Sequence, residues 1–94
     1  ITERDCQRIF VFCMRCFHPE IFTKMISDTP GMNNSVGYDI ILISESKTIF
    51  IDLKTKKGKK ENSQITLQKE VENFEFIEYV FLVVDLERKI LYTI

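Results

Sequence analysis

The chain has 94 residues, of which 45% are hydrophobic and eight are phenylalanine. This length is enough for one small domain with its own core and too short for two, so we expect a single domain over residues 1–94. The formal net charge is only −1, which excludes nucleic-acid binding through overall charge, and no apolar run reaches the roughly 20 residues of a membrane span, so no membrane partner is expected.

The first part of the chain has the periodicity of a helix. Between residues 3 and 17 the apolar positions recur at spacings of three and four, which predicts a helix. Pro19 interrupts this pattern because the residue before a proline avoids the helical region. We expect a short second helical stretch around residues 20–27. Residues 27–37 follow, and their proline, glycine, asparagine and serine content predicts a loop.

The cysteines allow two interpretations. With His18 they have the residue types of a zinc site, and residues 13–16 form a C-x-x-C. However, Cys6, Cys13 and Cys16 share the helical spacing of the apolar residues, and no second ligand pair has zinc-ribbon spacing, so we interpret them as core packing. Three is also an odd number, which argues against a secreted disulfide framework. An intracellular, reducing environment such as the cytoplasm or nucleus is therefore expected.

The second half of the chain is dominated by strands. Apolar runs of strand length cover residues 38–43 and 48–53, and residues 44–47 between them have hairpin-turn chemistry. Both runs are apolar at nearly every position, which predicts burial on both faces under helices.

The remaining elements complete the predicted fold. A lysine-rich loop is followed by a helix that begins with Asn62 or Ser63 as its N-cap and extends through Phe74, and two further strands cover residues 78–85 and 90–94. The predicted order is α-(α)-β-β-α-β-β. It indicates an α/β sandwich with a mixed sheet flanked by helices.

An aspartate stands inside the second apolar strand at Asp52, where a carboxylate is costly unless it is paired or binds a cation. Strand alternation places Asp52 and Lys54 on one face, and hairpin pairing brings Asp39 toward Asp52 at one end of the sheet. Two such carboxylates repel each other, and a divalent ion held by both and by the Leu53 main-chain carbonyl removes the repulsion. Mg²⁺ suits these oxygen ligands, and with the Lys54 ammonium beside it the site has the chemistry for phosphodiester hydrolysis.

A simpler interpretation stays open on these residues alone. Asp52 and Lys54 then form a buried ion pair, and Asp39 is exposed at the start of its strand. The lysine-rich loop likewise either contacts phosphates or is only a solvated connection. Its candidate DNA-binding residues are Lys56, Lys57, Lys59 and Lys60.

The whole stretch from residue 37 to residue 64 resembles the VRR-NUC domain of the PD-(D/E)XK nuclease superfamily. In that family an aspartate opens one strand and an acid-x-lysine lies in the next, with a glycine four residues and a glutamine ten residues after the lysine. The matching residues are Asp39, Asp52, Lys54, Gly58 and Gln64. Two positions depart from the pattern, since Tyr38 replaces the usual proline and Asp52 the more common glutamate.

The resemblance extends to the amino terminus, where Glu3 and Gln7 are similar to a glutamate and glutamine in the family's first helix. It implies a restriction-endonuclease-like fold, a metal site at Asp39 and Asp52 with Glu3 as a further ligand, and catalytic roles for Lys54 and Gln64. It also implies an Mg²⁺-dependent DNA endonuclease for which Mn²⁺ can substitute, without an organic cofactor. For the small stand-alone members found in phages and other viruses, it implies a homodimer that cuts branched DNA such as Holliday junctions.

Two other functions remain open at this stage. One is a non-catalytic DNA-binding module that keeps the fold and the lysine loop and does not need Mg²⁺. The other is a metal-dependent nuclease that acts on RNA or on the ends of linear duplexes, because no residue pattern here is typical of base-edge or 2′-hydroxyl recognition.

Overall fold

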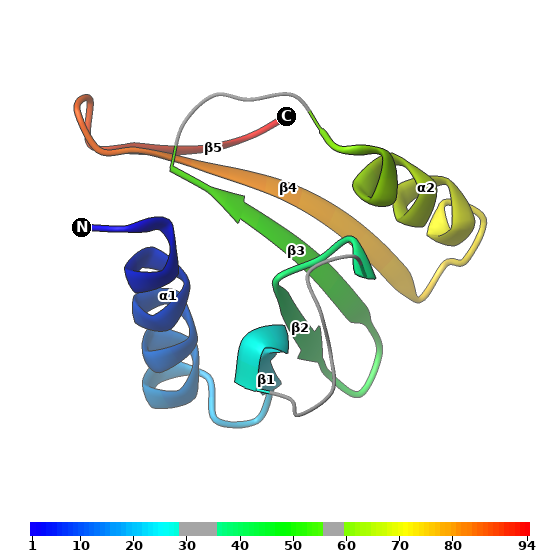
Figure 1. Ribbon diagram of the computed structural model, residues 1–94. Coiled ribbons are helices and arrows are strands. Elements are labelled where there is room, and N and C mark those ends of the chain that lie inside the picture. The colour runs from blue at the N-terminus through cyan, green and yellow to red at the C-terminus, as the bar shows by residue number, and fades with distance from the viewer. Residues whose placement is uncertain (29–35, 56–59) are drawn as a thin grey trace.

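A mixed β-sheet lies between two α-helices in the computed structural model, which describes residues 1–28, 36–55 and 60–94 (Figure 1). The helices are α1 (Glu3–Phe17) and α2 (Asn62–Val71), and the short 3₁₀ helix η1 (Ile26–Asp28) follows the first strand. The strands lie side by side in chain order and are β1 (Phe22–Met25), β2 (Ile40–Ile43), β3 (Thr48–Lys54), β4 (Ile77–Asp85) and β5 (Ile90–Thr93).

Neighbouring strands are antiparallel except β3 and β4, which are parallel and are connected through α2. The predicted α/β class, the mixed sheet and the flanking helices are confirmed. Within the described ranges, no helix is long and apolar enough to cross a membrane.

The element order differs from the prediction at one place. The prediction of a second helix around residues 20–27 is wrong. Four of its eight residues form the edge strand β1, in which Thr23 and Met25 are buried and Phe22 and Lys24 are more exposed, and its last two residues belong to the 3₁₀ helix η1. This alternation has the period of a strand. Pairing with β2 and two hydrogen bonds from the Arg15 guanidinium to the Thr23 carbonyl, at 3.0 and 3.3 Å, satisfy the backbone of this short strand.

The remaining elements agree with the predictions apart from their ends. The hairpin between β2 and β3 turns at residues 44–47, where the Ser44 amide donates to the Lys47 carbonyl at 2.8 Å. Helix α2 is capped by Glu61 rather than by Asn62 or Ser63, and it ends at Val71, short of Phe74. The expected loop at residues 27–37 falls mostly on residues 29–35, outside the described ranges.

The two faces of the sheet carry different side chains. The face toward α1 holds the main core, where Val11 of the helix packs with Ile51 and Leu53 of β3. The opposite face of β3 carries Phe50, Asp52 and Lys54 by alternation, and α2 packs over β4 on that side (Figure 1). Asp52 is therefore buried, at 2% exposure, on the face that α2 partly covers.

Candidate functional site

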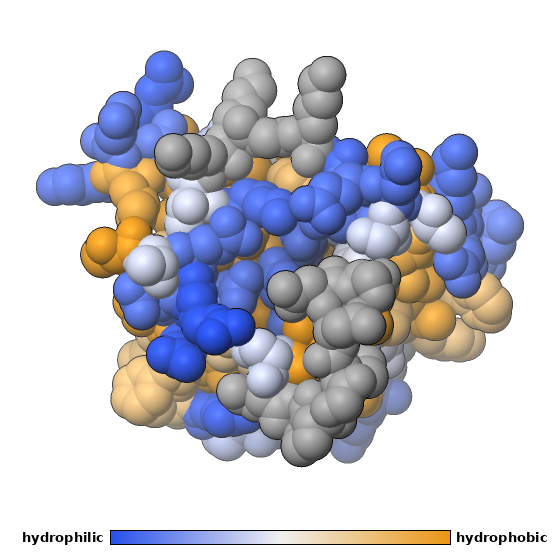
Figure 2. Space-filling view, viewed as in Figure 1, coloured by the Kyte–Doolittle hydropathy of each residue, from blue (hydrophilic) through white to orange (hydrophobic). Residues whose placement is uncertain are grey.

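A polar pocket of about 300 Å³ opens where both helices begin and β3 extends past the start of β2. Hydrophilic residues form a band across this face of the molecule between α1 and α2 (Figure 2). The charged and amide side chains that line the pocket are Glu3, Arg4, Gln7, Asp39, Asp52, Lys54, Glu61 and Gln64. The sequence-predicted residues Asp39, Asp52, Lys54, Gln64 and Glu3 are thus brought together in one pocket.

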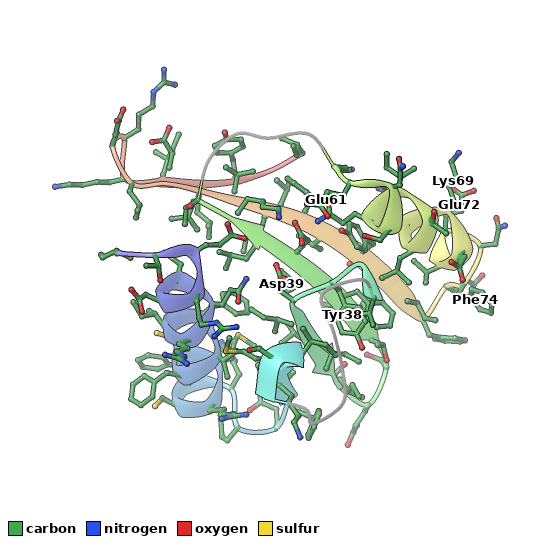
Figure 3. The ribbon with its side chains drawn as sticks, in the orientation of Figure 1. Tyr38, Asp39, Glu61, Lys69, Glu72 and Phe74 are labelled. Carbon is green, nitrogen blue, oxygen red and sulfur yellow. The ribbon has the colours of Figure 1, made fainter. Side chains whose placement is uncertain are left out.

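Asp39 directly precedes β2 and is held there by three hydrogen bonds (Figure 3). Its amide donates to the Ile51 carbonyl, and its own carbonyl accepts from the Ile26 amide, both at 2.8 Å. Its Oδ2 accepts a hydrogen bond from the Leu53 amide at 2.9 Å. The carboxylate therefore occupies the place where a β2 residue would pair with β3, and it is not the exposed strand-start residue of the simpler interpretation.

The Leu53 main chain is oriented toward the same place. The amide and carbonyl of one residue in an extended strand point to the same side. Since the Leu53 amide contacts Asp39, the Leu53 carbonyl also points to the Asp39 side of β3. Its orientation is compatible with the predicted third oxygen ligand.

Asp52 is the most perturbed group of the site. Burial and the charge of the neighbouring Asp39 carboxyl raise the pKa of Asp52 from 3.8 to about 7, against the opposing charge of Lys54. Its Oδ2 is buried and has no hydrogen-bond partner among the described residues. A buried carboxylate oxygen without a partner is expensive to keep, so this atom is the strongest single indication of a ligand-binding site.

Lys54 links the carboxylates of the site. Its Nζ lies 3.9 Å from Asp52 Oδ2 and 3.8 Å from Glu3 Oε1, and its side chain is 25% exposed. These distances give ionic attraction but are too long for hydrogen bonds. Burial and the charges of Asp39 and Glu61 raise the pKa of Glu3, while Lys54 lowers it. One ammonium thus balances several acidic groups, and the pocket retains an excess of negative charge.

Gln64 and Glu61 come from the first turn of α2. The Glu61 amide donates to Gln64 Oε1 at 2.6 Å, so the glutamine oxygen satisfies an amide at the helix start. Gln64 is buried, at 4% exposure, and it lines the pocket. Its position is consistent with the predicted supporting role, but its side-chain oxygen already serves the helix.

The predicted DNA-binding lysines are only partly described. Lys56, Lys57 and Lys59 lie outside the described residues. The Lys60 ammonium donates to Gln68 Oε1 at 3.1 Å and lies 5.7 Å from the centre of the Phe81 ring. Lys60 therefore packs along the protein surface next to the site, and its phosphate contact remains a prediction.

Three further residues near the site are not among its sequence-predicted members. Arg4 and Glu61 line the pocket, and the Tyr79 hydroxyl donates to the Gly37 carbonyl at 3.2 Å beside it. Burial and the charges of Asp52 and Asp39 raise the pKa of Tyr79. Arg4 had one available signal, since it adjoins Glu3 in the first helical turn. Glu61 had none, because its position depends on where α2 begins.

The two exposed cysteines correct an expectation. Cys13 and Cys16 lie on the solvent side of α1, and only Cys6 packs against the core. Core packing is therefore wrong for that pair. The zinc alternative gains no support either, since within residues 1–28, 36–55 and 60–94 no group of three or more histidine, cysteine, aspartate or glutamate side chains is placed to hold a metal ion.

This finding applies to the carboxylate pocket as well, and it bears on whether Mg²⁺ fits there. Mg²⁺ commonly uses one or two carboxylates and keeps several waters, so it does not need three acidic side chains from the protein. Asp39 and Asp52 supply two carboxylates, the Leu53 carbonyl points to their side, and Asp52 Oδ2 lacks a partner among the residues described. The donor set is thus compatible with Mg²⁺.

Comparisons with protein-family models, with curated proteins and with solved structures returned no match. No family is therefore shown for this chain. The resemblance to VRR-NUC nucleases depends on the residues and spacings given above, and the restriction-endonuclease-like fold stays a prediction.

Proposed function

We propose that this domain is a Mg²⁺-dependent DNA endonuclease whose site is the carboxylate pocket. The observation that carries the proposal is the buried Oδ2 of Asp52, which lies beside a second carboxylate and a lysine and has no hydrogen-bond partner among the described residues. Natural proteins seldom keep such a group without a functional reason, and perturbed carboxyl groups in a pocket are typical of catalytic sites. The simplest ligand that offsets the charge of Asp39 and Asp52 is a hard divalent cation.

Each residue of the carboxylate pocket has a role that follows from the chemistry of its side chain. Asp39, Asp52 and the Leu53 carbonyl would hold the cation, with Glu3 as a further acidic group at the rim. Once bound, Mg²⁺ supplies Lewis-acid stabilisation of the phosphate and acidifies a water molecule. Lys54, adjacent to Asp52 on the same strand, stabilises negative charge that develops on the phosphate and orients the attacking water.

The polarity of the helices favours a phosphate at the same place. Glu3 and Arg4 of α1 and Gln64 of α2 are first-turn residues, and all three line the pocket. Helix N-termini carry partial positive charge and favour anions. Arg4 adds a full positive charge at the rim, which helps to offset the carboxylates when a phosphate approaches.

Cleavage of labelled four-way-junction and linear duplex DNA, in Mg²⁺, Mn²⁺ or EDTA, tests the proposal. We expect divalent-dependent cutting that Asp52→Asn and Lys54→Ala each reduce by at least about a hundredfold. Lys47→Ala is the matched control, because it removes a lysine from an ion pair with Glu78 on the surface away from the pocket. Cutting that survives in Asp52→Asn, or that continues in EDTA, would refute the assigned site.

A second candidate is a DNA-binding module without turnover, which differs from the nuclease in its response to metal. Such a module would bind the same DNA with equal affinity in Mg²⁺ and in EDTA and would leave every substrate uncut. A parallel RNA substrate and a blunt duplex separate junction cleavage from cleavage of RNA or of duplex ends.

A homodimer remains part of the proposal. Large apolar side chains are exposed on α1 and on the edge strand β5, including Phe12 at 68% and Leu91 at 59%. Exposed apolar groups of this size are typical of surfaces that associate. Light scattering of the purified chain measures the oligomeric state directly, and a monomer at micromolar concentration would contradict this part.

A further inference from the structure

A second pocket lies next to the first on the same face of the sheet. Its volume is about 430 Å³, and Thr55, Val83, Leu86 and Tyr92 are among the residues that line it. Thr55 directly follows Lys54, the last residue of β3 and part of the carboxylate pocket, so both pockets lie at the same end of β3. The proposed reaction at Asp52 makes no use of this second pocket.

Strand register places the aromatic residue of this pocket in line with Lys54. Lys54 of β3 is paired with Val83 of β4, and Val83 is paired with Tyr92 of β5. Paired residues share a face of the sheet, and adjacent strands are about 4.8 Å apart, so the Tyr92 backbone lies about 10 Å from that of Lys54. This is a reach that one or two nucleotides of a single strand can span.

The charges of the second pocket differ from those of the first. Asp85 and Glu87 line it together with the apolar and aromatic groups. Asp85 Oδ1 accepts from the Glu87 and Arg88 amides, both at 3.1 Å, which fixes the turn after β4. Carboxylates repel a phosphate backbone, whereas the uncharged face of a base stacks on an aromatic ring irrespective of sequence.

We propose that the second pocket binds an unpaired nucleobase adjacent to the scissile phosphate, with Tyr92 as the stacking residue. The inference depends on the proposed action on DNA and narrows the substrate class. A base inside a duplex reaches such a pocket only after it is unstacked and unpaired, which costs a few kcal/mol. Gapped or flapped DNA, in which the base is already unpaired, is therefore the preferred substrate over a fully paired duplex or a four-way junction with every base paired.

The test combines a protein change with a DNA change. Binding is measured in the Asp52→Asn protein, which does not cut, with gapped DNA that carries one abasic position moved stepwise through the gap and its edges. Tyr92→Leu removes the ring and keeps an apolar side chain, and Tyr92→Phe is the control that keeps stacking. Circular dichroism and urea unfolding verify that each variant is folded.

We expect Tyr92→Leu to weaken binding to gapped DNA about 5- to 100-fold and Tyr92→Phe less than about twofold. One abasic position should weaken binding by the Tyr92 protein to the same extent and should have no further effect in Tyr92→Leu. Independent, multiplicative effects at every position, or equal affinity for gapped and fully paired DNA, would overturn the inference.

The outcomes also separate this inference from the proposed function. Metal-dependent cleavage without coupling between Tyr92 and a base overturns the base pocket and leaves the nuclease standing. Coupling without cleavage in any metal overturns the nuclease and retains the pocket in a DNA-binding module. Absence of DNA binding by every variant overturns both.

Discussion

Replacement of Asp52 by asparagine should stabilise the folded protein at alkaline pH when divalent cations are removed. The pKa of Asp52 is raised from 3.8 to about 7 by burial and by Asp39. Between these two pH values the folded state keeps the carboxyl protonated while the unfolded chain ionises it. The folded state then binds more protons, so the free energy of unfolding falls as pH rises through this window and stays low above it.

The size of the effect follows from the same pKa. A rise from 3.8 to about 7 corresponds to a ceiling of about 4 kcal/mol in the free energy of unfolding. Asparagine removes the charge but still has to bury an amide in the place of the carboxyl group, which cancels part of the gain. We therefore expect Asp52→Asn to be more stable than the native chain by about 1–2 kcal/mol at pH 8.5.

Urea unfolding in EDTA at pH 5 and at pH 8.5 measures this difference. At pH 5 the folded state still has Asp52 protonated while the unfolded chain has largely ionised it, so only part of the cost is present. The advantage of Asp52→Asn should therefore be smaller at pH 5 and reach its full size at pH 8.5. Glu78→Gln is a suitable control because it neutralises a half-exposed carboxylate far from the pocket. An Asp52→Asn protein that is less stable at pH 8.5, or a difference equal at both pH values, would refute the assigned electrostatics.

Three further substitutions test how the pocket is built. Gly37→Ala should destabilise the fold by about 2–4 kcal/mol in urea unfolding, because φ is +89° and an added Cβ would lie 2.6 Å from the Ser63 carbonyl oxygen; unchanged stability would contradict this close approach. Gln64→Ala should lower the free energy of unfolding by about 1–3 kcal/mol, since it leaves the Glu61 amide without its acceptor. A thermal midpoint equal to that of the native chain would argue against that bond. Tyr79→Phe should cost about 1 kcal/mol through loss of the bond to the Gly37 carbonyl, and a thermal midpoint equal to that of the native chain would show that the hydroxyl is dispensable.

The residues that sequence reasoning placed correctly are those governed by local rules. Asp52 and Lys54 share a face because a strand alternates, and Asp39 approaches them because a four-residue turn connects two adjacent strands. These relations need only the identity of each element and the pairing of neighbours, and both follow from short apolar runs with turn residues between them.

The residues that it misplaced depend on tertiary context. The four residues of β1 are too few to separate a strand period from a helical one, and only pairing with β2 and the Arg15 contact decide the outcome. The exposure of Cys13 and Cys16 could not be read from their spacing, because a helical stripe does not reveal which side faces the sheet. Glu61 enters the pocket because it is the N-cap of α2, one residue before the first of the two predicted caps.

The position of both aspartates on a single hairpin has a consequence for the speed of folding. Asp39 and Asp52 are close in sequence, and contacts between such residues form early because they close short loops. Their repulsion is therefore present while the hairpin first assembles, before α2 crosses over and docks on β4. We expect alkaline conditions to lower the folding rate of this chain more than they raise its unfolding rate. The hairpin that carries the candidate site would then also limit the rate at which the rest of the domain folds.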